Sequence, residues 1–200
     1  MTAKPRIVAR KLIHDGWNKV SLATVEAAGA DGRLARHDRE IVDHGNASVV
    51  LVVDREREVV LLVRQLRAPL LDADADPFLL EVCAGIIDPG ETPEETARRE
   101  AAEEVGVTVG AMRHVGTVFP SAGTLTEQMH LYVADVRSSD RTAPGGGMEG
   151  EGENIEVIEM PITELFDMVR HGRIIDAKTL IMAQWLMIEH LETRLKDSKR

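Results

Sequence analysis

The sequence contains a single cysteine, Cys83, and few aromatic residues, which make up 3% of the chain. One cysteine excludes an internal disulfide and any metal site built from several thiolates. Because aromatic residues are scarce, the hydrophobic core has to be built mainly from aliphatic side chains and methionine. We interpret Cys83 as a small core residue.

Basic residues are also in the minority, with 24 Lys and Arg against 34 Asp and Glu, for a formal net charge of −10. An acidic chain is repelled by a phosphate backbone, which argues against a nucleic-acid partner. No stretch reaches the roughly 18 consecutive apolar residues of a membrane-spanning helix. The basic segment 1–11 is not followed by the apolar run of a signal peptide. We therefore expect a cytoplasmic protein with no membrane partner.

The hydrophobic pattern of the first half predicts β-strands. An alternating run begins at Val20 and stops at the turn signal 29–32, after which 34–44 is extended. Two continuous apolar runs, 47–53 and 59–63, are typical of strands that are buried on both faces. Further strands are predicted at 78–83, 112–119, 128–136 and 155–160.

Helices are predicted at 92–105, 161–171 and 176–196, two of them with an amphipathic pattern. The mixture of strands and helices in 200 residues predicts an α/β fold. We expect residues 1–44 to form a separate N-terminal antiparallel sheet and residues 45–200 to form the main domain.

The helix at 92–105 has clear start and stop signals. Thr92 and Glu95 form a capping box around Pro93, and Gly106 follows as a left-handed C-cap.

Three glutamates, Glu100, Glu103 and Glu104, fall on one face of this helix. Like charges at this spacing repel, and oxygen ligands without Cys or His nearby favour Mg²⁺ first and Mn²⁺ second. Taken alone, the three residues are better explained as a solvated acidic face. The shaped loop 85–91 just upstream, with two glycines and a proline, instead favours a metal site.

The complete pattern from 85 to 107 resembles the Nudix box. It consists of Gly85, Glu91, Arg99-Glu100-Ala101, Glu103-Glu104 and Gly106-Val107. By this resemblance Glu100 and Glu104 are metal ligands together with the carbonyl of Ala84, and Glu103 is a further ligand or supporting catalytic group. Arg99 would pair with Glu91 and brace the loop against the helix. Gly85, Glu91 and Gly106 would be structural, with Gly85 also near the substrate.

Almost the whole chain resembles the ADP-ribose and GDP-mannose pyrophosphatase family, especially its GDP-mannose branch. The segments that carry this resemblance include 39–46, 63–67, 83–85, 121–127, 145–157 and 172–179. It implies a Nudix α/β/α sandwich with a mixed sheet, and an N-terminal sheet that is exchanged between the two subunits of a homodimer. The implied substrate-binding residues are Trp17, Arg39, Glu40, Arg67, Gly85, Glu127 and Lys178.

Simpler explanations exist for several of these residues. Trp17 could plug the N-terminal sheet, and Arg67 could be the exposed end of a strand. Lys178 lies in the first turn of a helix, where a cation opposes the helix dipole, which favours a functional role. One residue departs from the GDP-mannose pattern: Asp38 stands where that branch has a lysine ahead of Arg39-Glu40.

The Gly-rich acidic segment 137–154 offers a catalytic glutamate by the same resemblance. Counting back from Ile155 selects Glu153, and counting forward from the glycines at 145–147 selects Glu151. We favour Glu153, on the reasoning that the following strand anchors its position and the glycines do not. Its role would be to accept a proton from the attacking water or to complete the metal shell.

The function implied is Mg²⁺-dependent hydrolysis of the diphosphate bond of a nucleoside diphosphate sugar, with GDP-mannose favoured. The products would be a nucleoside monophosphate and a sugar 1-phosphate. An ADP-ribose pyrophosphatase that yields AMP and ribose 5-phosphate is the alternative within the class. A non-catalytic nucleotide-sensing domain is the alternative from another class, and the intact box argues against it.

Overall fold

The structure is a computed structural model that describes residues 4–148 and 154–198. It divides into two compact units. The N-terminal unit contains Met1–Asn46 and Phe119–Gln128, and the main unit contains Ala47–Val118 and Met129–Arg200. No helix within the described residues is long and apolar enough to cross a membrane.

The N-terminal unit is a three-stranded antiparallel sheet in the order β1-β2-β3. Its strands are β1 Arg6–Asp15, β2 Lys19–Ala28 and β3 Leu34–Asp43. We did not predict β1, because its apolar residues come as adjacent pairs, Ile7-Val8 and Leu12-Ile13, and not in alternation. The loop 119–128 joins this unit through Val42, whose N–H donates to Thr124 O at 2.9 Å.

The main unit is built on a seven-stranded mixed sheet with the path β10-β5-β4-β9-β8. Strand β4 runs parallel to β9, and the other pairs are antiparallel. The strands are β4 Ala47–Asp54, β5 Val59–Leu66, β6 Phe78–Glu81, β7 Cys83–Ile86, β8 Met112–Val118, β9 Met129–Val136 and β10 Glu156–Pro161.

The single strand expected at 78–83 is instead two strands, β6 and β7. Strands β4 and β5 pair with each other only over Val52–Asp54 and Val59–Leu61. Beyond these residues the two strands diverge. The segment 78–86 then pairs first with β5, as strand β6, and afterwards with β4, as strand β7. The change of partner occurs around Val82, so the expectation of one continuous strand was wrong.

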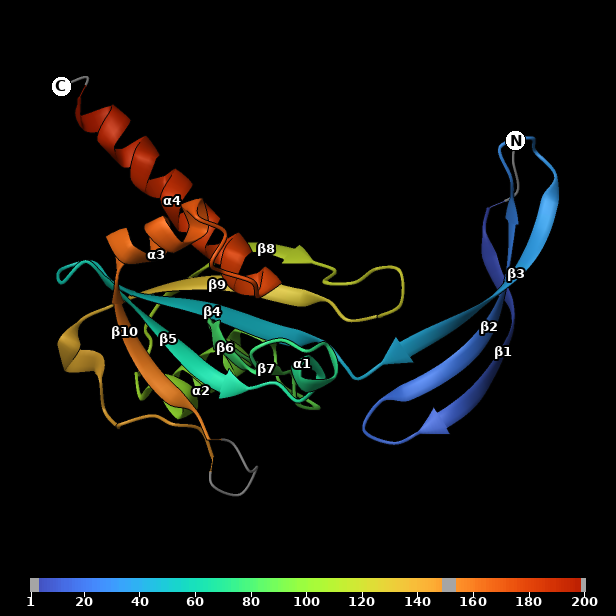
Figure 1. Ribbon diagram of the computed structural model, residues 1–200, viewed down its shortest axis with the longest axis horizontal. Coiled ribbons are helices and arrows are strands. Elements are labelled where there is room, and N and C mark those ends of the chain that lie inside the picture. Colours follow the sequence, from blue (N-terminus) through green and yellow to red (C-terminus); the bar gives the residue numbers. More distant parts are fainter. Residues whose placement is uncertain (1–3, 149–153, 199–200) are drawn as a thin grey trace. The chain divides into compact units, whose positions relative to one another are not determined.

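Helices cover both faces of this sheet, which gives the expected α/β/α sandwich. Figure 1 shows α3 and α4 on one face and α2 on the other. The helices are α1 Pro69–Asp72, α2 Pro93–Val105, α3 Ile162–Arg170 and α4 Ala177–Asp197.

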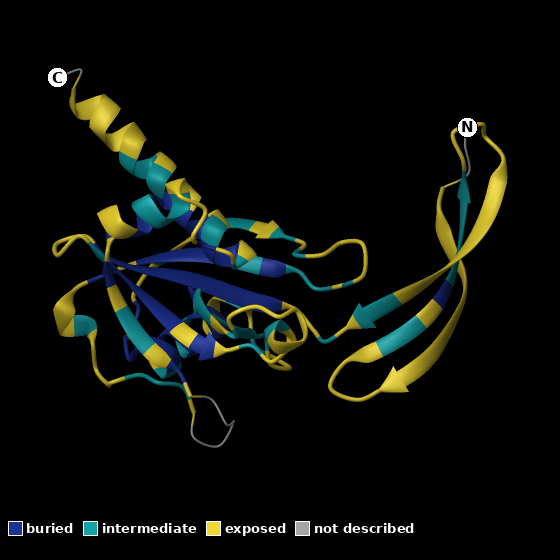
Figure 2. Ribbon diagram, viewed as in Figure 1, coloured by how far each residue is buried: buried dark blue, intermediate teal, exposed yellow. Residues whose placement is uncertain are grey.

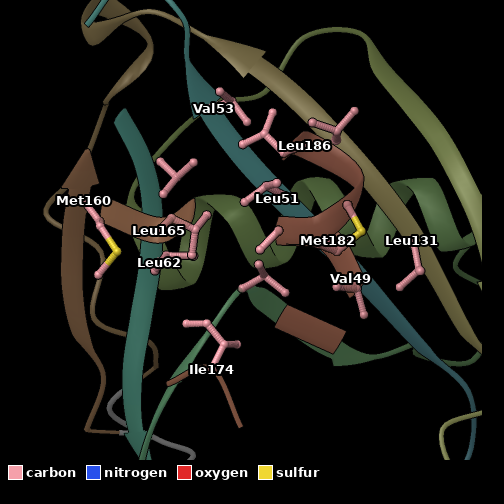
Figure 3. Close-up of a cluster of buried hydrophobic side chains, with 14 of the residues drawn as sticks. Val49, Leu51, Val53, Leu62, Leu131, Met160, Leu165, Ile174, Met182 and Leu186 are labelled. Carbon is pink, nitrogen blue, oxygen red and sulfur yellow. The ribbon is translucent and has the colours of Figure 1, made fainter. Parts of the chain in front are cut away.

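Strand β4 shows why both faces have to be covered. All eight of its residues are buried (Figure 2). Val49, Leu51 and Val53 pack in the cluster with α3 and α4 that Figure 3 shows, while Val50 and Val52 pack with α2. Successive side chains of a strand point to opposite faces, so a continuous apolar run requires a layer on each side.

Candidate active site

Helix α2 begins and ends where the local chemistry predicts. The Thr92 hydroxyl accepts a hydrogen bond from Glu95 N at 3.3 Å, and the Glu95 carboxylate accepts one from Thr92 N at 2.7 Å. Gly106 ends the helix with φ 71°, in the left-handed region. These caps determine which residues of α2 face the sheet and the loop before it.

Two carboxylates of α2 are buried against strand β7. Glu100 is 8% exposed and Glu104 is 2% exposed. The N–H of Ala84 donates to Glu104 Oε2 at 3.1 Å. A Cβ atom at Gly85 would lie 1.7 Å from Glu100 Oε1, so only glycine leaves room for this carboxylate. The glutamates that the sequence assigned to the metal therefore both lie beside the backbone of the same short strand.

Cys83 on β7 is fully buried beside these residues. Burial and the neighbouring Glu104 carboxylate raise the pKa of the Cys83 thiol well above its ordinary value. The thiol is therefore neutral and takes no part as a nucleophile.

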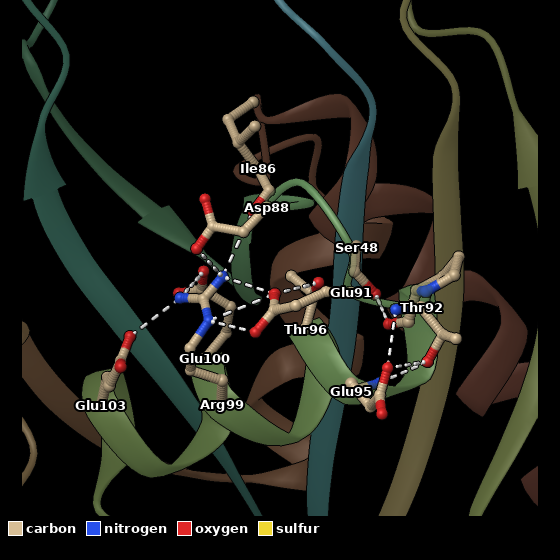
Figure 4. A network of polar contacts seen from close by, with 11 residues as sticks. Ser48, Ile86, Asp88, Glu91, Thr92, Glu95, Thr96, Arg99, Glu100 and Glu103 are labelled. Atoms are coloured by element: carbon tan, nitrogen blue, oxygen red, sulfur yellow. Dashed lines mark hydrogen bonds and ion pairs between the residues drawn. The ribbon is translucent and has the colours of Figure 1, made fainter.

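Arg99 joins the loop to the helix, as Figure 4 shows. Its Nε lies 3.2 Å from Glu91 Oε1, and its Nη2 donates to the carbonyl of Ile86 at 3.2 Å. Nη1 donates to Glu100 Oε1 at 2.7 Å and to Glu103 Oε2 at 3.0 Å. The pairing with Glu91 is the one that the resemblance implied.

These ion pairs also shift the pKa values of the groups involved. Burial acts to lower the pKa of Arg99, but Glu91 and Glu100 outweigh it and raise that pKa. The hydrogen bond from Arg99, with a second from Thr96, lowers the pKa of Glu91. Loop and helix are thus held together by charges that persist through neutral pH.

Arg67 and Lys178 meet at a glutamate that the sequence analysis did not single out. Arg67 donates to the two carboxylate oxygens of Glu81 at 2.6 and 2.8 Å, and the Lys178 ammonium donates to the same carboxylate. The sequence signal that could have identified Glu81 is its charge inside the otherwise apolar strand predicted at 78–83.

The glycine tract at 145–147 is fastened to the C-terminal end of α2. Gly146 N donates to the carbonyl of Glu104 at 2.9 Å, and Gly147 N donates to the carbonyl of Glu103 at 3.1 Å. A Cβ atom at Gly145 would lie 2.5 Å from the Glu104 carbonyl oxygen. The premise that the glycines do not anchor this segment was therefore wrong, since they satisfy helix carbonyls that would otherwise lack partners.

Glu151 and Glu153 lie outside the residues that the structure describes. The preference for Glu153 rested on the wrong premise about the glycines. The choice between the two residues is therefore open again.

The remaining predicted substrate residues belong to the N-terminal unit. Trp17 lies in the turn between β1 and β2 and is 85% exposed. Arg39 and Glu40 are consecutive on β3, so their side chains leave opposite faces of that strand. Glu127 is paired with His44 at 3.5 Å.

The donor chemistry of the α2 face suits a hard divalent cation. Within residues 4–148 and 154–198, no three His, Cys, Asp or Glu side chains are grouped so that they could bind one metal ion. Glu100 and Glu104 nevertheless provide buried carboxylate oxygens beside the glycine that makes space for one of them. Carboxylate oxygens are the ligands that Mg²⁺ and Mn²⁺ prefer.

Comparison with known proteins identifies the same region. The NUDIX domain model matches residues 43–180. A GDP-mannose pyrophosphatase of Klebsiella pneumoniae subsp. pneumoniae is 38% identical over 198 residues, which cover 98% of each chain. Proteins of that name from Cronobacter sakazakii and Salmonella arizonae are 38% and 35% identical, over 94% and 96% of this chain and 97% and 99% of their own.

Proposed function

The chain belongs to the Nudix family, and we propose that it hydrolyses the diphosphate bond of GDP-mannose to GMP and mannose 1-phosphate. The observation that carries this proposal is near-full-length similarity to GDP-mannose pyrophosphatases together with an intact box. The box geometry supports the reaction class, because Glu100 and Glu104 are buried beside Gly85. A domain that only senses nucleotides has no need for these carboxylates.

We propose Mg²⁺ as the cofactor, with Mn²⁺ as a substitute. Glu100, Glu104 and the carbonyl of Ala84 would hold the cation, and Glu153, or Glu151 in its place, would complete its shell from the acidic segment. Glu103 would assist them as a further ligand or supporting group. When bound, the ion supplies positive charge that neutralises the diphosphate oxygens and favours ionisation of water.

The other residues bind the substrate or move a proton. Arg67 and Lys178 would contact the diphosphate and the sugar phosphate, since charge-assisted hydrogen bonds to phosphate are strong. Glu151 or Glu153 would accept the proton of the attacking water. Trp17, Arg39, Glu40 and Glu127 would contact the base, the ribose and the terminal sugar, with Trp17 supplied by the partner subunit.

A homodimer is part of this proposal, because the N-terminal sheet exposes large apolar side chains on its first strand. Ile7, Leu12 and Ile13 of β1 are 46%, 50% and 48% exposed. Every residue of β1 is exposed. A three-stranded sheet needs a covered hydrophobic face to be stable, and a second copy of the chain would provide one. Sedimentation should give about twice the 22.0 kDa chain mass, and a fully active monomer would contradict the shared site.

One residue favours the ADP-ribose alternative. Asp38 accepts a hydrogen bond from the Thr24 hydroxyl at 2.7 Å, so its carboxylate is held on the sheet beside Arg39. A carboxylate at this position removes the positive charge that the GDP-mannose pattern has there.

The deciding experiment compares kcat/KM for GDP-mannose, GDP-glucose, ADP-ribose, ADP-glucose and UDP-sugars with Mg²⁺. We expect GDP-mannose to be the best substrate. If ADP-ribose has the higher kcat/KM, the ADP-ribose alternative holds. Asp38→Lys should then raise the ratio of kcat/KM for GDP-mannose to kcat/KM for ADP-ribose.

A further inference from the structure

Among the described residues of the main unit, Glu81 is the one fully buried carboxylate without a role in the proposed metal site or in the proposed substrate contacts. Its side chain is 0% exposed, at the end of β6, where the chain changes its partner strand from β5 to β4. Burying a charge is costly unless it is paired and hydrogen-bonded. The partners of Glu81 therefore indicate what the residue does.

Both partners are cations that we assign to the substrate. Arg67 binds Glu81 through Nε at 2.6 Å and Nη2 at 2.8 Å, a two-point contact that defines the plane of the guanidinium. Lys178 binds the same carboxylate and also Asp176 Oδ1 at 3.1 Å. Although burial acts to raise the pKa of Glu81, Arg67 and Lys178 lower it, so the carboxylate stays ionised at neutral pH.

The contact holds Arg67 from one side only. The Arg67 side chain is 40% exposed, whereas Glu81 is fully covered. Nη1, the third nitrogen, makes no hydrogen bond to any described residue, so its two N–H groups are available to a ligand. The Glu104 carboxylate contributes to the raised pKa of Arg67, which puts the guanidinium within electrostatic range of the proposed metal helix.

Lys178 is held by a second set of contacts. Asp176 caps α4 by accepting hydrogen bonds from Thr179 N at 3.0 Å and Thr179 Oγ1 at 2.6 Å. The Thr179 hydroxyl in turn accepts from Val82 N at 2.9 Å, directly after Glu81 in the chain. The start of α4 is thereby tied to the β6–β7 junction, and Lys178 is fixed to the same carboxylate as Arg67.

We propose that Glu81 is a positioning residue that orients Arg67 and Lys178 toward the diphosphate of the substrate. This inference rests on the proposed function, since it assigns the two cations to that substrate. Glu81 itself touches no substrate. It converts two flexible basic side chains into a preorganised pair, and preorganised charge is what stabilises a transition state.

The charge balance gives this role a kinetic signature. Glu81 offsets one of the two positive charges, so Glu81→Gln leaves more positive charge for ground-state binding of phosphate. The same change frees the guanidinium from its two-point contact. We therefore expect kcat to fall at least about tenfold while KM stays level or decreases, because orientation matters most in the transition state. A purely structural role would lower the melting temperature and leave kcat unchanged below it.

The test is a double-mutant cycle of Glu81→Gln, Arg67→Lys and the double variant. Lysine keeps the charge of Arg67 but lacks the planar two-point contact. If Glu81 acts through Arg67, the double variant should lose little more kcat than the worse single variant. Fully multiplicative losses, or a kcat of Glu81→Gln within twofold of wild type, would overturn the proposal.

Glu189→Gln is the matched control. Glu189 also lies between two cations, Arg55 Nη2 at 2.6 Å and Arg113 Nη1 at 2.6 Å, but none of these residues belongs to the proposed site. We expect this variant to change thermal stability and to keep the wild-type kcat. If it reduces kcat as Glu81→Gln does, the effect is general loss of ion pairing, and the proposal fails.

Two further measurements keep the test decisive. If Glu81→Gln does not fold, Glu81→Asp keeps the charge but withdraws the carboxylate by one methylene. A wild-type kcat in that variant would also refute positioning. The cycle is repeated on affinity for inorganic pyrophosphate by calorimetry, which needs no turnover. Non-additive effects of the two substitutions on pyrophosphate affinity would support the role of Glu81 even if GDP-mannose is not the substrate. Additive effects on this affinity would count against the role.

Discussion

Gly85→Ala tests the geometry of the proposed metal site with the smallest possible change. A Cβ atom at this position would lie 1.7 Å from Glu100 Oε1 and 2.2 Å from its Cδ. Non-bonded heavy atoms of this kind are optimally about 3.5 Å apart. The Glu100 carboxylate therefore has to move by more than about 1.5 Å, or the β7 backbone has to shift by a similar distance.

The expected consequence is a large loss of kcat with a modest loss of stability. A displacement of about 1 Å at a catalytic group can cost roughly 10²-fold in rate, and this displacement is larger. The clash involves the end of a flexible side chain, so overpacking should cost only about 1–3 kcal/mol of unfolding free energy. We therefore expect a folded enzyme whose kcat falls at least about 10²-fold and whose affinity for Mn²⁺, measured by calorimetry, is reduced.

Gly110→Ala is the control, because a Cβ atom there meets no heavy atom within 4 Å. It should behave as wild type in both assays. If Gly85→Ala keeps the wild-type kcat and metal affinity, Glu100 does not need the position that the structure gives it. Its assignment as a metal ligand would then be wrong.

Three other predictions concern the same helix and the segment bound to it. Glu104→Gln should lower kcat by at least about 10²-fold with a smaller change in KM, and wild-type turnover at saturating Mg²⁺ would refute its role. Gly145→Ala should lower kcat because its Cβ would clash with the α2 backbone. Gly123→Ala should not lower kcat, because a Cβ there meets nothing within 4 Å. Equal activities of the two variants would show that the close approach of Gly145 to α2 is dispensable. Of Glu151→Gln and Glu153→Gln, one should lose about 10²-fold in kcat and the other should be mild, and two near-normal variants would remove the general base from this segment.

The elements that sequence analysis located well are those with local signals. Helix α2 has a capping box at Thr92 and a left-handed Gly106, and both occur as expected. The buried strands β4 and β5 have continuous apolar runs between charged turns, and that pattern does not depend on distant contacts. The Nudix box is also a local signal, because it is defined by residue spacing within one loop and one helix.

The features that were missed depend on distant partners. Strand β1 lacks alternation, so nothing local distinguishes it from a loop. The interruption at Val82 follows from the divergence of β4 and β5, which are separate strands earlier in the chain. Glu81 could be noticed as a charge in an apolar strand, but its partner Lys178 is 97 residues away. Such pairings require the folded chain.

The most direct test of the central claim is ³¹P NMR of GDP-mannose incubated with the protein, with and without Mg²⁺. We predict that the two diphosphate resonances are replaced by the resonances of GMP and mannose 1-phosphate in equal amounts, and only when Mg²⁺ is present. With Glu104→Gln the same replacement should be at least about 10²-fold slower. Intact GDP-mannose, or cleavage to GDP and mannose, would contradict the account.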